Sequence, residues 1–331
     1  MALNPNPSAK RILGIALQSA FGTPAASPVF YVRASKFTGK VVSKPLYDGA
    51  FMGDLADTHQ AVSGTSHVEI DGTIVAALDS IGFPFNGVMN HVNYIAGVNP
   101  APNTHEYALG LGQPSFFTVW DFTGAVTRQY QDVMFSDLTL KGDTSKVVEA
   151  DIKGTGTQVT PTGTAAPVWT NEMPLTHWAS VFSVGASSAS TVNGKSESWE
   201  FDFKRDVTPI FTDGSRYPTA IVATTLDVTG KFTLVVDGTN VPELTAFESF
   251  TPRYVSVVCA PNAGGAESLK VEVLNAVYED GELNVGSLKD VIKFDGTFKA
   301  VAASTTLTGA TGLNSPAQVT LLNGEASGIY A

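Results

Sequence analysis

The chain has 331 residues, of which 43% are apolar and only 15% are charged, and its formal net charge is −11. This composition is typical of a globular chain that is long enough for two domains, and it excludes a disordered protein. The acidic balance argues against a protein that grips nucleic acid through its phosphates, because such binding needs a basic surface. No run of about 18 apolar residues occurs, so the sequence predicts no membrane-spanning helix.

In the first half, apolar and polar residues alternate along several segments, which indicates half-buried strands. We expect a strand at 29–38, a long loop at 44–63, a long strand at 64–75, a helix at 75–81 and a closing strand at 146–154. In the long strand, Val68 and Ile70 share one face, whereas Glu69 and Asp71 share the other. One face of this strand therefore belongs to the core and the other to a polar surface.

The second half repeats this order of elements. We expect a strand at 196–204, a long loop at 205–221, a long strand at 222–236, a helix at 240–249 and a closing strand at 289–299. Sequence identity between the halves is low, so the order of elements is the argument for an internal duplication. The predicted fold is all-β, with one short helix in each module.

A segment rich in turn formers, residues 155–174, separates the halves and contains several Gly, Pro and Thr residues. We place a domain boundary in this segment. The first module, with an N-terminal arm, spans 1–160. The second module, with the linker and a C-terminal segment, spans 161–331.

Two further acidic pairs follow the strand pattern. Glu149 and Asp151 lie two residues apart on one predicted strand, and Glu200 and Asp202 do so on another. Each pair therefore projects from one face of its strand. Such pairs can serve a glycosidase or a calcium site, but a solvated sheet face is the simpler interpretation.

Signals of catalysis are missing from the sequence. The five histidines show no metal-ligand spacing, no nucleophile elbow is present, and no glycine-rich phosphate loop joins a strand to a helix. The single cysteine, Cys259, lies in an apolar stretch and is expected to be a buried thiol. We expect no catalytic residues, no cofactor and no metal site.

The two long loops mix aromatic and charged residues. Loops of this length are uncommon in compact domains unless they have a function, so we expect them to contact other subunits. The residues expected at such contacts are Tyr47, Asp48, Phe51, Met52, Asp54 and Asp57 in the first loop, and Phe211, Asp213, Arg216 and Tyr217 in the second.

The N-terminal segment Gly14–Pro24, with the sequence GIALQSAFGTP, and the strand that follows it resemble the opening of major tail tube proteins of long-tailed, siphovirus-like bacteriophages. The segments VSGTSHVEIDG at 62–72 and RYPTA at 216–220 are also similar to this family. The resemblance covers roughly residues 12–323 and consists of weakly specific pieces in the right order.

The resemblance implies β-sandwich modules that close into homo-oligomeric rings, which stack into a hollow tube for DNA ejection. It implies a structural virion protein of the tail, assembled in the host cytoplasm, without catalysis. Its partners would be further copies of the chain, a tape-measure protein and tail-end proteins. DNA would pass through the lumen without specific binding, and no membrane would be involved.

Two predictions join the pattern to the resemblance. An acidic channel wall would repel DNA phosphates, so we expect one or more of the strand carboxylates to face the lumen. The candidates are Glu69, Asp71, Glu149, Asp151, Glu200 and Asp202. If each half is one tube module, a trimer would close the ring that single-module relatives fill with six chains, with a hexamer as the alternative.

The sequence is also compatible with two other functional classes. One is a carbohydrate-binding or carbohydrate-active β-sandwich, with Trp120, Trp169, Trp178 and Trp199 as sugar platforms. Trp199 alternates with acidic residues beside Phe201 and Phe203, which favours a place in the core. The other class is a minor tail protein.

Overall fold

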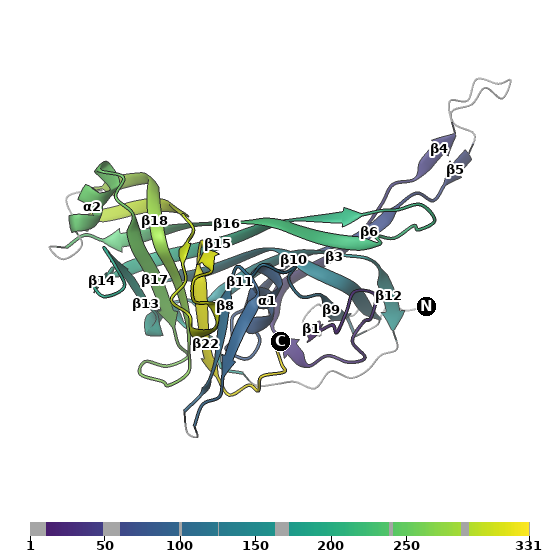
Figure 1. Ribbon diagram of the computed structural model, residues 1–331, viewed down its shortest axis with the longest axis horizontal. Coiled ribbons are helices and arrows are strands. Elements are labelled where there is room, and N and C mark those ends of the chain that lie inside the picture. Colours follow the sequence, from purple (N-terminus) through teal and green to yellow (C-terminus); the bar gives the residue numbers. More distant parts are fainter. Residues whose placement is uncertain are drawn as a thin grey trace, which may run out of the picture.

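The computed structural model describes residues 11–48, 60–98, 101–124, 126–162, 172–237, 241–285 and 291–330. Strands dominate these residues, as the alternating sequence pattern predicts (Figure 1). The α-helices are α1 (Gly82–Val88) and α2 (Val241–Glu248), and short 3-10 turns occur at η2 (His177–Ala179) and η3 (Thr308–Ala310). The all-β fold class with one short helix in each half is confirmed.

The first half forms two connected antiparallel layers. Its strands are β1 (Ile12–Leu17), β2 (Phe30–Val32), β3 (Ala34–Ser43), β4 (Leu46–Asp48), β5 (Gln60–Val62), β6 (Ser66–Val75), β7 (His91–Ile95), β8 (Asn103–Ala108), β9 (Phe117–Phe122), β10 (Thr127–Asp143), β11 (Glu149–Gly156) and β12 (Val159–Thr162). The pairing order is β2–β1–β9–β10–β11–β6–β3. The start of β10 pairs with β9 and β12, and its end pairs with β11.

The second half has the same strand order. Its strands are β13 (Val181–Gly185), β14 (Thr191–Asn193), β15 (Ser196–Ile210), β16 (Ala220–Val235), β17 (Arg253–Cys259), β18 (Ser268–Asn284) and β19 (Lys293–Ala300), followed by β20 (Ala303–Ser304), β21 (Asn314–Ser315) and β22 (Gln318–Asn323). The pairing order β14–β13–β17–β18–β19–β16–β15 reproduces that of the first half strand by strand.

The repeat extends to irregular features of the strands. A bulge interrupts β3 between Ala34 and Lys36, and the corresponding bulge interrupts β15 between Ser196 and Ser198. Another pair of bulges lies in β10 after Phe135 and in β18 after Tyr278. Because bulges are specific local features of a strand pair, their coincidence aligns the halves residue by residue.

A matched pair of hydrogen bonds supports the same alignment. Thr73 Oγ1 donates to Asp151 Oδ1 at 2.5 Å between β6 and β11. Thr233 Oγ1 donates to Asp295 Oδ1 at 2.5 Å between β16 and β19, at the equivalent positions. The two halves are therefore structural copies in spite of their low sequence identity.

The two copies are joined edge to edge. The end of β10 pairs antiparallel with β15, from Asp137 opposite Lys204 to Asp143 opposite Ser198. This junction creates one continuous sheet in the order β3–β6–β11–β10–β15–β16–β19–β18. The core lies on one side of this sheet and contains the buried aromatic rings of Trp199, Phe201 and Phe203.

The C-terminal segment returns to the first half. Strand β22 pairs with β18 on one side and with β8 on the other. The Tyr330 ring lies 5.1 Å from the Phe83 ring of α1, and the backbone carbonyl of Tyr330 accepts a hydrogen bond from Asn86. The division into modules at 1–160 and 161–331 stays a prediction, because strands from both halves contribute to this region.

Some predicted elements are wrong in position or extent. The helix expected at 75–81 lies at 82–88, and residues 78–81 form a turn before it. The strand expected at 29–38 is divided into β2 and β3. The loop expected at 205–221 is shorter than predicted and spans 211–219, because β15 continues to Ile210 and β16 begins at Ala220. Cross-strand pairing extends this hairpin beyond the region where its sequence alternates.

Candidate functional site

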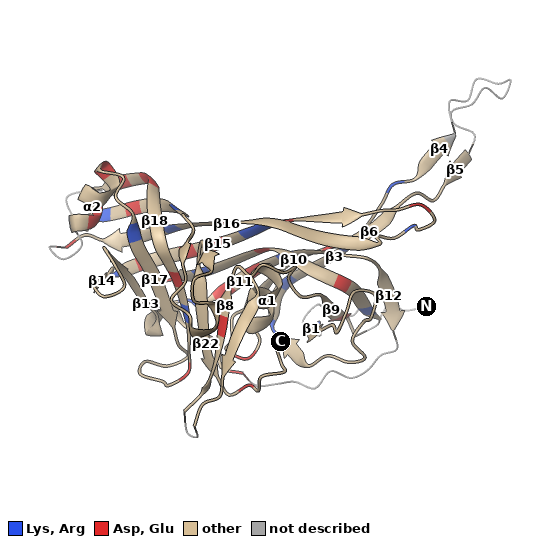
Figure 2. Ribbon diagram, in the orientation of Figure 1, with Lys and Arg blue, Asp and Glu red and all other residues tan. Residues whose placement is uncertain are grey.

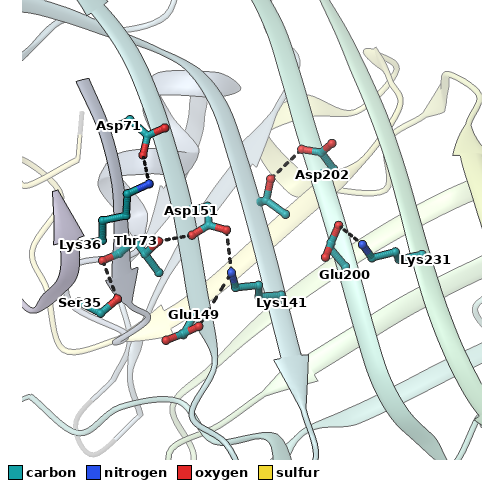
Figure 3. Close-up of polar contacts among 11 residues, drawn as sticks. Ser35, Lys36, Asp71, Thr73, Lys141, Glu149, Asp151, Glu200, Asp202 and Lys231 are labelled. Carbon is teal, nitrogen blue, oxygen red and sulfur yellow. Dashed lines mark hydrogen bonds and ion pairs between the residues drawn. The ribbon is translucent and has the colours of Figure 1, made fainter. Parts of the chain in front are cut away.

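The six predicted carboxylates lie on one side of the continuous sheet, and Figure 3 shows all of them except Glu69. Glu69 and Asp71 come from β6, Glu149 and Asp151 from β11, and Glu200 and Asp202 from β15. Their neighbours Ile70, Ile152 and Phe201 are buried in the core on the opposite side. We call the surface that carries these carboxylates the polar face.

Opposite charges alternate across the strands of the polar face. Residues directly opposite each other in adjacent strands form two rows, Asp71–Lys153–Asp137–Lys204–Asp227 and Glu149–Lys141–Glu200–Lys231. Both rows cross the β10–β15 junction without interruption. Directly opposed unlike charges stabilise an antiparallel sheet, so the rows reinforce the pairing that joins the two halves.

Several of these residues form ion pairs. Lys231 Nζ lies 3.0 Å from Glu200 Oε1, and Lys36 Nζ lies 3.3 Å from Asp71 Oδ1. Lys141 Nζ lies 2.7 Å from Asp151 Oδ2. These side chains are partly exposed, so each pair contributes only about 0.2–1 kcal/mol. Burial alone would raise the pKa of Asp151, but hydrogen bonds from Lys141 and Thr73 outweigh it and the pKa is lowered.

The polar face has more carboxylates than lysines. In the continuous sheet it carries Glu69, Asp71, Asp137, Asp143, Glu149, Asp151, Glu200, Asp202, Asp227, Asp280, Glu282 and Asp295, together with Lys36, Lys40, Lys141, Lys153, Lys204, Lys231, Lys293 and Lys299. Figure 2 shows both charges along the strands and a concentration of acidic residues around α2 and the adjoining end of β18. The face is therefore acidic in balance, with most charges beside an opposite one.

The first predicted contact loop includes a projecting hairpin. Strands β4 and β5 pair from Leu46 opposite Val62 to Asp48 opposite Gln60, and the hairpin extends away from the body of the molecule (Figure 1). Leu46, Tyr47 and Val62 are 59%, 67% and 61% exposed. We call the paired strands Leu46–Asp48 and Gln60–Val62 the arm. Four predicted contact residues, Phe51, Met52, Asp54 and Asp57, lie outside the described residues.

The second predicted contact loop is the tip of the β15–β16 hairpin and contains Phe211, Asp213, Arg216 and Tyr217. The Arg216 carbonyl accepts a 2.9 Å hydrogen bond from the Ser66 backbone N–H, and the Phe211 ring lies 6.2 Å from the His67 ring. This tip of the second half therefore contacts the start of β6 in the first half. Its contact with other subunits stays a prediction.

The sheet ends in two edges that the sequence pattern did not single out. In the part of the chain that the structure describes, β3 pairs only with β6, and residues 277–283 of β18 pair only with β19. Val41 on β3 and Leu283 on β18 are 50% and 45% exposed. Exposed apolar residues on an unpaired strand edge mark a place where another strand can add. We call β3 and residues 277–283 of β18 the open edges.

The structure also brings together two histidines that sequence spacing did not relate. His91 Nε2 on β7 lies 3.3 Å from His105 Nδ1 on β8. Burial and then the neighbouring His105 lower the pKa of His91 to about 4. Among the described residues, no group of three or more His, Cys, Asp or Glu side chains is placed to hold a metal ion.

Other side chains singled out in the sequence lie in the core. Trp199 and Trp120 are buried, as is Cys259, and burial raises the pKa of the Cys259 thiol to about 12. Trp178 is exposed, whereas Trp169 lies outside the described residues. Buried indoles cannot serve as sugar platforms.

Over the described ranges, no helix has the length and apolar character needed to cross a membrane.

A family model described as phage tail tube protein matches residues 8–292. The chain belongs to this family. The match begins before β1 and ends just before β19, so it covers most of both copies of the repeated module. A search of the curated proteins finds no match.

Membership of the tail tube family makes this chain a structural component of a bacteriophage tail. Proteins of such a family assemble with copies of themselves and with other tail proteins. The likeness of the N-terminal and central segments to tail tube proteins is thereby confirmed. An account of how the subunits assemble has to include three surfaces: the polar face, the arm and the open edges.

Proposed function

We propose that this chain is the major subunit of the tail tube, and that its copies close into stacked rings around a channel for DNA ejection. The observation that carries this proposal is the β10–β15 junction. There, two copies of one module already pair edge to edge within a single chain. A ring forms when the same kind of junction repeats at every position until the circle closes.

The repeat supports three chains in each ring. Each chain contributes two modules, because both halves have the same strand order and the same bulges. A ring of six module positions therefore needs three copies, with threefold symmetry and a pseudo-sixfold outline. A ring of six chains would contain twelve modules, twice as many as a ring of six single-module chains. The junction inside each chain would then not correspond to a junction between neighbouring chains of that smaller ring.

The polar face is our proposal for the channel wall. It is the side of the continuous sheet opposite the core, and its carboxylates outnumber its lysines. A weakly acidic wall repels DNA phosphates, whereas a basic wall would bind them. In this proposal Glu69, Asp71, Glu149, Asp151, Glu200 and Asp202 face the lumen, and DNA passes without specific binding.

The remaining parts of the proposal concern assembly. The arm and the tip at 211–219 would contact neighbouring subunits or rings, since the arm exposes Leu46, Tyr47 and Val62 to solvent in the single chain. A tape-measure protein would occupy the channel during assembly in the host cytoplasm. Tail-end proteins would bind the terminal rings.

Electron microscopy and native mass spectrometry of the purified protein test the proposal. We expect rings or tubes in the micrographs, and a ring with the mass of three chains. A chain that stays monomeric at high concentration would refute the tube function. Rings of six chains would leave the tube function standing and refute the count of three.

A further inference from the structure

The two open edges have a defined relation to the internal junction. By structural equivalence, β3 is the counterpart of β15, and β18 is the counterpart of β10. The chain therefore carries one unpaired copy of each strand that forms the β10–β15 junction. We propose that β18 of one copy pairs antiparallel with β3 of the next copy, in the register of the internal junction. This inference rests on the proposed ring function and specifies its contact.

The matching bulges relate the register of the internal junction to the register that we expect between neighbouring copies. In β15 the bulge aligns Phe201 with Gly39 of β3, because these residues follow the bulge at the same distance. In β10 and β18 the bulge aligns Leu140 with Leu283. Leu140 lies opposite Phe201 in the internal junction. Leu283 is therefore expected to lie opposite Gly39 of the next copy.

The same translation defines a ladder between subunits. From β18 of one copy to β3 of the next, the expected opposing residues are Asp280 and Val42, Gly281 and Val41, Glu282 and Lys40, and Leu283 and Gly39. A register slip of one residue would place every side chain on the wrong face of the sheet.

Charge supports this register. Glu282 and Lys40 are both exposed in the single chain and come directly opposite each other in the ladder. Their counterparts in the internal junction are Thr139 and Asp202, and Thr139 Oγ1 donates to Asp202 Oδ1 at 2.8 Å. A polar side-chain contact at this position of the internal junction thus becomes an ion pair between subunits.

The other charged residues of the two open edges also favour pairing of β18 with β3 over pairing of two like edges. Strand β3 carries Lys36 and Lys40, whereas the end of β18 carries Glu279, Asp280 and Glu282. Like edges would repel each other, so two β3 edges or two β18 edges cannot pair favourably. The charges therefore favour the head-to-tail arrangement that closes a ring.

Apolar burial supports the pairing on the core side. Val41 and Leu283 are 50% and 45% exposed in the single chain. Their counterparts Phe203 and Leu140 are 0% exposed in the internal junction. In the ladder, Leu283 lies beside Gly39 and Val41 beside Gly281, so each exposed apolar side chain meets a residue without a side chain. The pairing removes both apolar groups from water.

Charge reversal tests the contact. We expect Lys40→Glu and Glu282→Lys each to lower the yield of rings and tubes by at least about tenfold, because each places like charges opposite each other. The double variant should recover assembly. Lys146→Glu makes the same charge change at the exposed turn between β10 and β11 and should assemble normally. Normal assembly of both single variants, or failure of the double variant while each single variant remains folded, would overturn the contact.

Cross-linking tests the register independently of the charges. We expect Lys40→Cys with Glu282→Cys to form disulfides between copies in assembled rings when the rings are exposed to a mild oxidant such as oxidised glutathione, giving covalent oligomers on a non-reducing denaturing gel. Lys40→Cys with Asp280→Cys is shifted by two residues and should cross-link poorly. The native Cys259 is buried and should not interfere.

The outcomes separate the inference from the function on which it rests. If the unaltered chain forms rings but the Lys40–Glu282 cysteine pair does not cross-link, or cross-links no better than the shifted pair, the register is wrong and the tube function stands. If the unaltered chain forms neither rings nor tubes, the proposed function and this inference both fail.

Discussion

The guanidinium of Arg205 donates a 2.9 Å hydrogen bond to the carbonyl of Val88, the last residue of α1. Arg205 comes from β15 in the second half, so this contact ties the two halves together from within the core. A second carbonyl, that of Met89, accepts a hydrogen bond from the same nitrogen at 3.1 Å. A cation is favourable at a helix C-terminus, where backbone carbonyls lack partners within the helix.

Replacing Arg205 tests how much this contact contributes to the free energy of unfolding. Arg205→Met leaves the carbonyls of Val88 and Met89 buried without their donor, so we expect the free energy of unfolding to fall by about 2–4 kcal/mol. Urea denaturation followed by circular dichroism measures the change. Lys204→Met alters the neighbouring residue on the polar face and should cost less than about 1 kcal/mol. Equal losses for the two variants would contradict a special role for Arg205.

The matched hydrogen bonds of the two halves predict matched mutational effects. Thr73→Val and Thr233→Val each remove one hydroxyl that donates to a carboxylate. We expect each to lower the free energy of unfolding by about 1 kcal/mol. Both variants can be compared in one denaturation series. A clear loss in one variant and none in the other would show that the equivalent positions are energetically different.

Acid should destabilise the region around His91. In the folded chain, burial and then His105 lower the pKa of His91 to about 4, whereas the ordinary histidine value is 6.5. Between these values the unfolded chain binds more protons, so stability falls as pH decreases from about 6.5 toward 4 and is unaffected by His91 above that range. The pKa of His105 is also lowered by burial and acts in the same direction.

His91→Phe removes one titrating group and keeps a ring beside Tyr107, which lies 5.3 Å from the imidazole. The difference in urea midpoint between pH 7.5 and pH 5 should therefore be smaller for this variant than for the unaltered chain. An unchanged difference would show that other groups cause the acid sensitivity.

The arm should matter for assembly but not for folding. Leu46 and Tyr47 are 59% and 67% exposed, so the double change to Ser should alter the free energy of unfolding by less than about 0.5 kcal/mol. We expect tubes to be much shorter or absent, because the exposed apolar surface of the arm is lost. Leu111→Ser is the control, since Leu111 is 98% exposed away from the arm. Tubes of normal length from the double variant would show that the arm has another role.

Much of the polar face could be predicted because strand alternation is a local property. Glu200 and Asp202 alternate with Trp199, Phe201 and Phe203 in the sequence, and the structure places these sets on opposite sides of β15. Local pattern cannot reveal which strands pair. The β10–β15 junction joins residues about sixty positions apart, and its register became visible only in the structure.

The position of helix α1 was predicted wrongly for a different reason. Its sequence, GFPFNGV, contains glycine and proline and has little helix propensity. Phe83 and Phe85 are 0% exposed, so burial of aromatic rings stabilises the helix against local preference. The segment 75–81 has a more helical sequence, yet its residues 78–81 form the turn before the helix. The pair His91 and His105 was missed because β7 and β8 bring distant positions together.

The alternating rows of the polar face have a consequence for any polyanion that moves along it. Neighbouring strands are about 4.8 Å apart, so unlike charges repeat with a period of about 10 Å across the sheet. The electric field of these alternating charges cancels within a few ångströms of the surface. Beyond that distance only the weak field of the net charge of the face remains. A passing phosphate would therefore meet a nearly level potential with no deep wells. Such a surface would retard a passing phosphate only weakly, and its unlike charges also stabilise the pairing of the strands. A wall charged uniformly with either sign would not have both properties.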